Sequence, residues 1–366
     1  MSYKLRGHKL LHHQNEIKNW QDKKMFPPVF IEFGPVGGCN HRCVHCYVQN
    51  ILNTPPEMME PDVYLRFMRE IGDYGVKAIV LAGVGEPLLH RTTPRAVETA
   101  VEHGTDVGML SNGIPLTEKN IPTLLDNLTY IRFTVNGSNK INYAKTHQTS
   151  ENDWDKLLKN LDMIANYKKK SKSKCTIGIY TVLFENNLPD LLKWVKHVKS
   201  LGLDYIIAKP PNVRMDNVKM FEQLKYEKNQ ETLEEIKNLT SENFHVELRE
   251  DLFNDAQTTK KYSECLGLPF MCAVDSDGSI YTCNWYWREK KYLYGNLKNS
   301  TFKEIWESDQ KKKVLEYVGN PDSGFDIKKC GACRQDNINL FLEGLKYGRV
   351  NPGEPEGEKP KHINFL

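Results

Sequence analysis

Between residues 29 and 209, strand-like and helix-like stretches alternate with short loops between them, and this alternation most constrains the fold. Alternation of this kind favours parallel βαβ units around one core. The sequence therefore predicts an α/β fold with a partial (β/α)6 TIM-type barrel, because the pattern stops at Pro210-Pro211, short of a full eight-unit barrel. The predicted strands are Val29–Val36, Lys77–Ala82, Asp106–Leu110, Tyr130–Val135, Cys175–Leu183 and Tyr205–Lys209, and the predicted helices between them are Asp62–Tyr74, Pro94–Glu102, Leu116–Asn127, Asn152–Lys169 and Leu188–Leu201.

The loop after the first predicted strand holds Cys39, Cys43 and Cys46 in the spacing C-x3-C-x2-C. Three thiolates suit a cuboidal [4Fe–4S] cluster and leave one of its irons without a protein ligand. Such an iron can bind and reduce a small molecule, whereas a cluster with four cysteine ligands usually only carries electrons. The alternative is a zinc site, in which His41 or His45 would complete a Cys3His set.

The next three strand exits carry small or polar residues. They are Gly83–Pro87, Ser111–Gly113 and Thr134–Gly137. Functional residues of such barrels lie at the carboxyl ends of the strands, so these exits are expected to line one ligand site with the cysteine loop. The alternative is ordinary turn chemistry, since Gly, Asn and Pro mark loops in any protein.

The cysteine motif, with His45 directly before its last cysteine, resembles that of the radical S-adenosylmethionine (radical SAM) superfamily, and the resemblance covers roughly residues 29–210. In that family the open iron chelates the methionine part of SAM, and one electron cleaves SAM to a 5′-deoxyadenosyl radical that abstracts hydrogen from a substrate. Gly85-Glu86-Pro87 resembles the end of the family's glycine–glycine–glutamate–proline motif, with Val84 in place of the first glycine. The resemblance implies SAM contacts at Gly85, Glu86, Ser111, Asn112 and Asn136.

A second group of cysteines follows residue 260 and comprises Cys265, Cys283, Cys330 and Cys333. Residues 273–282 between the first two predict a β-hairpin with Asp277-Gly278 at its turn. A hairpin brings its flanking cysteines together, and the C-x2-C pair can close the site from a distant loop because loop-closure cost grows slowly with length.

This second group resembles the C-terminal SPASM and twitch modules of radical SAM enzymes, including the stretches Gly295-Asn296-Leu297 and Phe302–Trp306. No cysteine follows Cys333, which favours the shorter twitch type with one auxiliary [4Fe–4S] cluster on the four cysteines. The alternative is a structural zinc on the same ligands, which would supply folding energy but no electron chemistry. The aromatic run from Tyr281 to Trp287 is expected to shield this site from water.

Cys272 and Cys175 stand outside both groups. Cys272 lies on the first predicted hairpin strand, where three roles are open: a ligand in place of Cys265, a small buried hydrophobe, or a hydrogen-atom donor that faces the active site. Cys175 begins the fifth predicted strand at its amino end, so it is expected to be structural.

Composition limits partners and compartment. Lys+Arg 50 against Asp+Glu 47 gives a net charge of +3, so no nucleic-acid partner is indicated. The chain has no apolar run long enough to span a membrane and begins with a polar stretch, which predicts a cytosolic protein. Nine cysteines in such a protein favour metal or redox chemistry over disulfides.

The predicted layout has five parts. Histidines in the first part, including His13, are expected to be exposed, and the apolar end Ile363–Leu366 can dock on the core or stay loose. The parts are an N-terminal arm (1–28), the radical SAM partial barrel (29–211), a linker with a helix and a strand (212–260), the auxiliary cluster module (261–340) and a C-terminal tail (341–366).

The resemblance implies an enzyme that abstracts hydrogen from its substrate, with a flavodoxin- or ferredoxin-type protein as reductant. If the auxiliary cluster accepts the electron left on the substrate, the reaction is a two-electron oxidation; if Cys272 returns a hydrogen atom, it is an epimerisation. Only about 28 residues precede the first strand, too few for the leader-binding domain of many peptide-modifying relatives. The expected substrate is therefore a small polar molecule (a sugar, aminocyclitol or nucleotide-linked metabolite), with a peptide as the alternative. A two-cluster electron-transfer protein is the non-enzymatic alternative.

Overall fold

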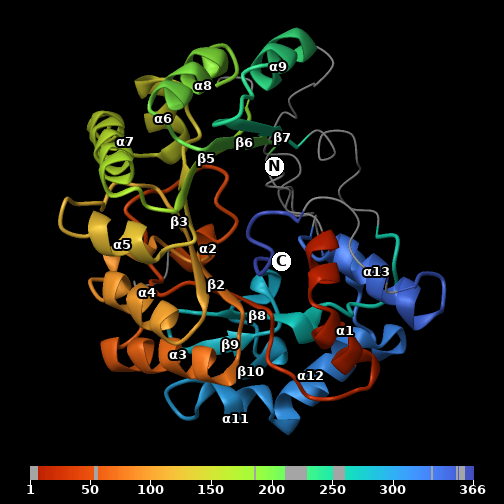
Figure 1. Cartoon of the computed structure of the whole chain (residues 1–366). Helices are drawn as coiled ribbons and strands as arrows, with labels where there is room; N and C mark the ends of the chain where they lie inside the picture. Colours follow the sequence, from red (N-terminus) through yellow and green to blue (C-terminus); the bar gives the residue numbers. More distant parts are fainter. Residues whose placement is uncertain are drawn as a thin grey trace.

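A single ten-stranded sheet organises the molecule, in the order β10-β9-β8-β1-β2-β3-β4-β5-β6-β7 (Figure 1). The computed structural model describes residues 7–52, 57–184, 187–210, 229–249, 260–330, 333–351, 353 and 359–366. Strands β8, β1 and β2 to β7 run parallel, whereas β8–β9 and β9–β10 are antiparallel pairs. The parallel α/β sheet with an antiparallel hairpin at one end confirms the predicted fold class.

All six predicted strands are present, and a seventh follows them. Strand β7 (His245–Leu248) pairs in parallel with β6 and comes, like α9 (Gln230–Lys237), from the segment predicted as a linker with a helix and a strand, much of which lies outside the described residues. This segment therefore continues the barrel sheet. The six strands are β1 Phe30–Phe33, β2 Ala78–Leu81, β3 Asp106–Ser111, β4 Tyr130–Thr134, β5 Thr176–Val182 and β6 Tyr205–Lys209.

Helices cover the outer face of the sheet (Figure 1). Helix α3 starts at Pro61, where the missing N–H of proline is not needed, and ends at Gly75 with a φ of 100°. Its Tyr64 and Phe67 pack edge-on against Phe33 of β1, with ring centroids 5.1 and 5.3 Å apart. Burying side chains of this size stabilises the fold by about 1.5–3 kcal/mol each. The outer helices are α3 Pro61–Tyr74, α4 Thr93–Glu102, α5 Ile121–Asn127, α6 Lys140–His147, α7 Asn152–Ser171 and α8 Leu191–Ser200.

The opposite side of the sheet, the inner face, is more polar. Side chains alternate between the two faces along a strand, so Phe30 and Glu32 of β1 lie on the inner face while Ile31 and Phe33 pack with the helices. Arg132 of β4 is buried among three inner-face tyrosines, with its guanidinium carbon 5.3–6.0 Å from their ring centroids. Its Nε donates to the hydroxyl of Tyr205.

The C-terminal module joins the barrel through its sheet. Strand β8 (Met271–Val274) pairs in parallel with β1, in the register Phe30↔Met271 to Phe33↔Val274. The predicted hairpin follows, with Gly278 at a φ of 88° in its turn. The remaining elements of the module are β9 Ser279–Tyr281, β10 Leu293–Asn296, α11 Phe302–Trp306, α12 Asp309–Gly319 and α13 Asp336–Lys346.

The two ends of the chain pack together on the inner side of the barrel. Phe365 and Leu366 are buried, and Phe365 contacts the rings of Phe30 and Tyr130. The Lys9 ammonium donates to the carbonyls of His362 and Phe365, both at 3.0 Å. The N-terminal arm forms a 3-10 helix, Gly7–His12, and α1, Gln14–Gln21. The predicted exposure of His13 is wrong, because its ring is buried beside the carbonyl of Ile363.

Among the described helices, none is long and apolar enough to cross a membrane.

Candidate active site and auxiliary cluster site

Cys39, Cys43 and Cys46 lie between the carboxyl end of β1 and the short helix α2 (Gln49–Leu52). The loop is compact, with the amide of Cys46 donating to the carbonyl of Cys43 at 3.1 Å. Burial raises the pKa of Cys39 to about 11 and raises the pKa of the other two thiols as well. A metal cluster would deprotonate these thiols on binding, which couples its uptake to proton release.

The second strand exit packs directly on this loop. The amide of Glu86 donates to the carbonyl of Gly38 at 3.0 Å. Gly85 has a φ of +71°, and a Cβ at this position would lie 2.2 Å from the carbonyl oxygen of Val36 and 2.3 Å from that of Gly38. Only glycine fits such a close approach of two backbones.

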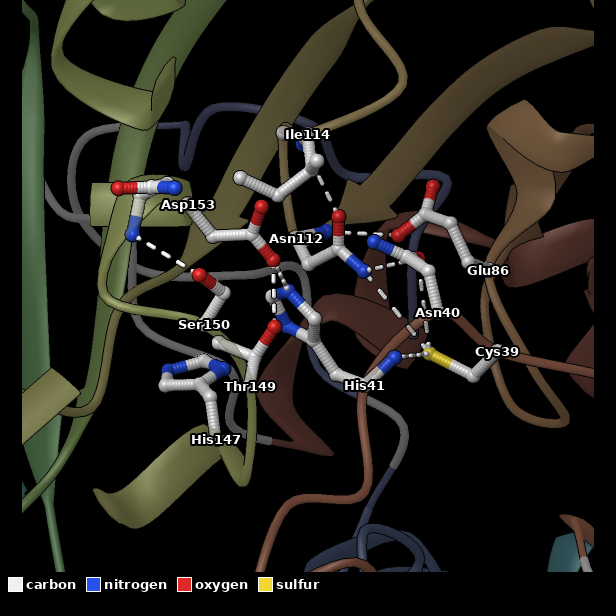
Figure 2. Close-up of polar contacts among 12 residues, drawn as sticks. Cys39, Asn40, His41, Glu86, Asn112, Ile114, His147, Thr149, Ser150 and Asp153 are labelled. Carbon is white, nitrogen blue, oxygen red and sulfur yellow. Dashed lines mark hydrogen bonds and ion pairs between the residues drawn. The ribbon is translucent and has the colours of Figure 1, made fainter. Parts of the chain in front are cut away.

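The Glu86 carboxylate ties the second strand exit to the third. It accepts a hydrogen bond from the amide of Asn112 at 2.7 Å (Figure 2). It also accepts hydrogen bonds from the hydroxyl of Ser111 at 2.8 Å and from the amide of Leu88 at 3.0 Å. Burial raises the pKa of Glu86 to about 7, although these three donors act in the opposite direction. In this structure Glu86 and Ser111 therefore brace the loops, while the family resemblance gives them SAM contacts.

Asn112 and Asn136 reach the cysteine loop from two further strand exits. The Asn112 amide donates to Asn40 at 2.8 Å and lies 3.8 Å from the sulfur of Cys39 (Figure 2). The Asn136 amide nitrogen lies 2.9 Å from Nε2 of His45, whose pKa burial lowers to about 4. The structure thus gathers the other three strand exits that the sequence singled out around the cysteine loop, which is the first.

Two further histidines complete the surroundings of the loop: His147, which the sequence did not single out, and His41, which it suggested only as an alternative zinc ligand. His147, at the end of α6, places its Nδ1 3.3 Å from the sulfur of Cys43. His41 lies beside it and pairs through Nε2 with Asp153 at 3.1 Å (Figure 2). Burial lowers the pKa of both rings. No local motif marks His147. The helix that carries it, α6, was not predicted, and His147 follows Cys43 by 104 residues, a separation that no known ligand spacing specifies.

The four C-terminal cysteines line one cavity, which is otherwise walled by apolar and aromatic side chains such as Phe325, Trp285 and Leu268. Donors surround the thiols: the amide nitrogen of Asn339 lies 3.7 Å from Cys265, the amide of Gln335 3.4 Å from Cys333, and the hydroxyl of Tyr286 3.1 Å from Cys330. Buried thiols with hydrogen-bond donors and a dry apolar wall fit an iron–sulfur cluster. The cysteines of this cavity are Cys265, Cys283, Cys330 and Cys333.

The aromatic run from Tyr281 to Trp287 serves both sites. Trp285 and Tyr286 line the auxiliary cavity, as expected for a shield. Tyr281 and Trp287, however, pack with Cys39 and Cys46 at the first site. The end of the hairpin therefore lies between the two cysteine groups.

Strand directions separate the two cysteine sites. The loop that carries Cys39, Cys43 and Cys46, from here on called the cluster loop, follows the carboxyl end of β1. Cys265, in contrast, precedes β8, which is parallel to β1. Cys283 follows β9, which is antiparallel to β8, so it returns to the same amino-end edge. The two sites therefore lie toward opposite ends of β1. This strand has four residues and is roughly 13 Å long. The inner face of the barrel lies between the sites.

Glu32 of β1 lies on this intervening surface and is met by residues from both sites. The Asn284 amide donates to both carboxylate oxygens at 3.1 and 3.2 Å, Arg334 pairs with one at 3.3 Å, and the Tyr47 hydroxyl donates at 3.4 Å. These three partners directly follow Cys283, Cys333 and Cys46 in the sequence. We call these four residues the Glu32 junction.

Cys272 lies in the hydrophobic core and is fully buried. It pairs in register with Ile31, so its side chain is on the helix-covered face, whereas its neighbour Ala273 pairs with Glu32 on the inner face. Burial raises its pKa well above the usual range for a thiol. This position favours the packing role over the ligand and hydrogen-donor roles. Cys175 is likewise buried in the core, as expected.

The partial parallel barrel with a cysteine loop at the first strand exit, joined to a second cysteine site, defines a class of iron–sulfur enzyme. A family model of the radical SAM superfamily matches residues 34–198, and a model of the SPASM iron–sulfur cluster-binding domain matches residues 265–335. The chain belongs to the radical SAM superfamily and carries a C-terminal SPASM domain. Its cofactors are accordingly SAM, the radical SAM [4Fe–4S] cluster and the auxiliary iron–sulfur centre of the SPASM domain.

The proteins similar to this chain are named for different molecules. It is 24% identical, over 85% of its length and 90% of the relative's, to the AdoMet-dependent heme synthase of Methanosarcina barkeri (strain Fusaro / DSM 804). Among solved structures, it resembles Streptococcus suis SuiB bound to precursor peptide SuiA, with a TM-score of 0.62 and 12% identity over 91% of this chain and 76% of that one. It also resembles anSMEcpe with bound AdoMet, with a TM-score of 0.57 and 18% identity over 85% and 88% of the two chains. The two structural similarities show the shared fold.

Proposed function

We propose that this radical SAM enzyme oxidises a small polar molecule, such as a sugar, aminocyclitol or nucleotide-linked metabolite, by two electrons. In this proposal Cys39, Cys43 and Cys46 hold the cluster that binds SAM, and the C-terminal cysteines hold one auxiliary cluster. The first cluster would supply the reductive cleavage of SAM that starts hydrogen abstraction, and the second an acceptor for the electron left on the substrate. A flavodoxin- or ferredoxin-type protein would supply the reducing electron.

The Glu32 junction is the observation that carries this proposal. A substrate that loses hydrogen at one cluster and an electron to the other is well placed between them, and the partners of Glu32 come from both cysteine groups. Its carboxylate is almost fully buried, with 4% of the side chain exposed, yet it faces Arg334, whose side chain is 35% exposed. A carboxylate there can accept a hydrogen bond from a substrate hydroxyl or ammonium group and receive the proton that an alcohol releases when it becomes a carbonyl.

The charge of the inner face favours a substrate that also carries an acidic group. Among the described residues, no carboxylate forms an ion pair with the buried Arg132 guanidinium. Burying an unpaired cation is costly unless a ligand compensates it. A phosphate or carboxylate of the substrate is the natural counter-ion for this guanidinium.

Two alternatives have less support. Peptide modification rests on fold similarity to proteins solved with bound peptides, at identities below 20%. The curated relative that spans most of both chains is named for heme, which is a small molecule and not a peptide. Epimerisation with Cys272 as hydrogen donor requires that thiol on the inner face, whereas it packs on the opposite one.

The test is anaerobic turnover of the reconstituted protein with SAM, a reductant and a panel of phosphorylated sugars, nucleotide sugars, aminocyclitols and short peptides. We expect 5′-deoxyadenosine together with a product that has lost two hydrogens, from a member of the acidic sugar group. Glu32→Gln should lower product formation about 10²–10⁴-fold if the carboxylate receives the proton, while the protein still cleaves SAM.

Matched cysteine variants separate the two clusters. Cys283→Ala should retain cleavage of SAM and lose the oxidised product, whereas Cys175→Ala, which changes a buried core cysteine outside both groups, should retain both. Failure of the fully iron-loaded protein to form 5′-deoxyadenosine from SAM in the presence of any member of the panel would favour the electron-transfer alternative.

A further inference from the structure

The last turn of α6 holds the cluster loop by its backbone. The amide of Arg42 donates to the carbonyl of His147 at 3.1 Å, and the amide of Val44 donates to that of Thr146 at 3.0 Å. These two bonds flank Cys43 on both sides. The side chain of His147 is therefore fixed relative to one particular cysteine of the loop.

The imidazole of His147 is held in one orientation and one tautomer. Its Nε2 accepts a hydrogen bond from the backbone amide of Asn136 at 2.9 Å. A backbone amide can only donate, so Nε2 carries the lone pair and the ring proton is on Nδ1. The ring is fully buried and stacks on Tyr143, with centroids 4.2 Å apart and planes inclined by 24°.

That Nδ1–H lies 3.3 Å from the sulfur of Cys43, within hydrogen-bonding distance. The ligand atoms of His41, Cys43 and His147 all lie within 4.8 Å of one another, which raises the possibility of a separate mononuclear metal site. The tautomer argues against it, because Nδ1 of His147 bears a proton and offers no lone pair while Asn136 occupies Nε2. His147 is therefore arranged as a donor to the thiolate.

We infer that His147 is a positioning residue that donates a hydrogen bond from Nδ1 to the Cys43 thiolate and thereby raises the reduction potential of the SAM-binding [4Fe–4S] cluster. The inference rests on the proposed assignment of Cys43 as a ligand. A hydrogen bond to a cluster ligand stabilises the more negative, reduced form more than the oxidised form, and such bonds are among the factors that set the potential. The residue acts through Cys43 and need not touch SAM or substrate.

The inference also gives the Asn136 strand exit a second function. Its backbone amide fixes the histidine tautomer while its side chain meets His45, the residue before Cys46. One residue of the fourth strand exit is thus connected to two cysteines of the loop. A shift of this exit on ligand binding would move the donor to Cys43 at the same time.

The test is an EPR-monitored redox titration of the full-length protein with both clusters, in which the SAM-binding cluster is identified as the one whose signal changes on addition of SAM. His147→Phe keeps a flat ring against Tyr143 and removes the donor. A hydrogen bond to a charged group is among the stronger ones in proteins, so we expect its removal to shift the reduction equilibrium about tenfold toward the oxidised cluster, or 59 mV for a one-electron couple. His147→Gln, which can both accept and donate, should recover at least half of this shift.

Tyr143→Phe is the matched control, since it retains the stacked ring and removes a hydroxyl that makes no hydrogen bond among the described residues; its potential should stay close to that of the unaltered protein. An iron-loaded His147→Phe variant with unchanged potential would overturn the inference. If that variant takes up no iron, the smaller His147→Leu is titrated instead and is judged by the same result. Loss of iron in both would assign His147 a purely structural role and overturn the inference too. No substrate is needed, so this test is independent of the oxidation proposed above, whereas the absence of any SAM-sensitive signal in the unaltered protein would contradict the ligand assignment itself.

Discussion

Replacing Gly85 with alanine would test whether the second strand exit supports the cluster loop. Two costs follow from the structure. A positive φ of 71° costs an L-residue about 1–2 kcal/mol. The added Cβ would also lie 2.2 and 2.3 Å from the carbonyl oxygens of Val36 and Gly38, so backbone on one side must move, at about 1–3 kcal/mol for overpacking of this kind. The expected loss in unfolding free energy is therefore about 2–5 kcal/mol.

Gly104 offers a matched control for the backbone term. It has a φ of +86°, and an added Cβ would meet no atom within 4 Å. Gly104→Ala should therefore lose only about 1–2 kcal/mol. The difference between the two variants, about 1–3 kcal/mol, isolates the contact with the cluster loop.

The assay is urea unfolding of both variants in the iron-free state, followed by iron analysis after anaerobic reconstitution. We expect Gly85→Ala to unfold at a clearly lower urea concentration than Gly104→Ala and to lose about the iron of one [4Fe–4S] cluster, because the backbone that carries Cys39 must move. Equal unfolding midpoints for the two variants, with full iron in both, would refute the argument that these backbones touch.

Three further predictions concern the rest of the molecule. Burial lowers the pKa of Lys311 from 10.5 to about 7, so between these pH values the unfolded chain binds a proton that the folded chain does not, and stability should rise with pH. Lys311→Met should reduce this rise between pH 7.5 and 9.5 in urea unfolding, with the remainder due to Lys9, whose pKa burial also lowers to about 7. The exposed Lys312→Met should keep the full rise. Cys272→Ala should keep the iron content and the yield of 5′-deoxyadenosine of the unaltered protein, because the thiol lies on the helix-covered face, and loss of iron would return it to the ligand set. Changing Cys39, Cys43 and Cys46 together to Ala should leave about four irons in the auxiliary site, whereas their complete loss, with zinc found instead, would mean that the C-terminal site is structural.

The predicted strands were found because each is a short apolar run bounded by loops, and burial between helices and the inner face requires such runs. Strand β7 and helix α6 carried weaker signals. His245 and Glu247 alternate with apolar residues in β7, and the buried residues of α6 are Tyr143, Thr146 and His147 instead of aliphatic side chains. Their positions are fixed by tertiary contacts, with β6 and with the cluster loop, which no local pattern records.

The pairing of β8 with β1 shows the same limit more clearly. The two strands are about 240 residues apart in the sequence, and nothing in either one specifies the other as its neighbour. The hairpin itself was predictable from Asp277-Gly278, whose turn conformation is local. The hairpin can attach to the barrel only at a sheet edge that the segment between β1 and β8 has left unpaired. Which edge remains unpaired is a property of the whole fold.

The residues of the candidate site also differ in whether the sequence alone could identify them. The cysteines could be identified because a metal cluster requires ligands of one kind at fixed spacings. Glu32 could not, since it lies in the apolar strand Phe30–Phe33 and its partners come from three distant loops. His147 was missed for a similar reason, because a hydrogen-bond donor to a thiolate has no required spacing from it.

The shared sheet has a consequence for how the two iron–sulfur sites work together. Because β8 is hydrogen-bonded to β1, the auxiliary module cannot move away from the cluster loop without breaking a parallel pair of four residues. The ion pair of Arg334 with Glu32 and the hydrogen bond from Asn284 to Glu32 add a second connection across the inner face. The separation between the sites is therefore set by strand geometry, which varies little, and not by a flexible linker. A substrate held at the Glu32 junction would meet both sites without domain closure, so specificity must come from the side chains that line the inner face, foremost Arg132 and Glu32.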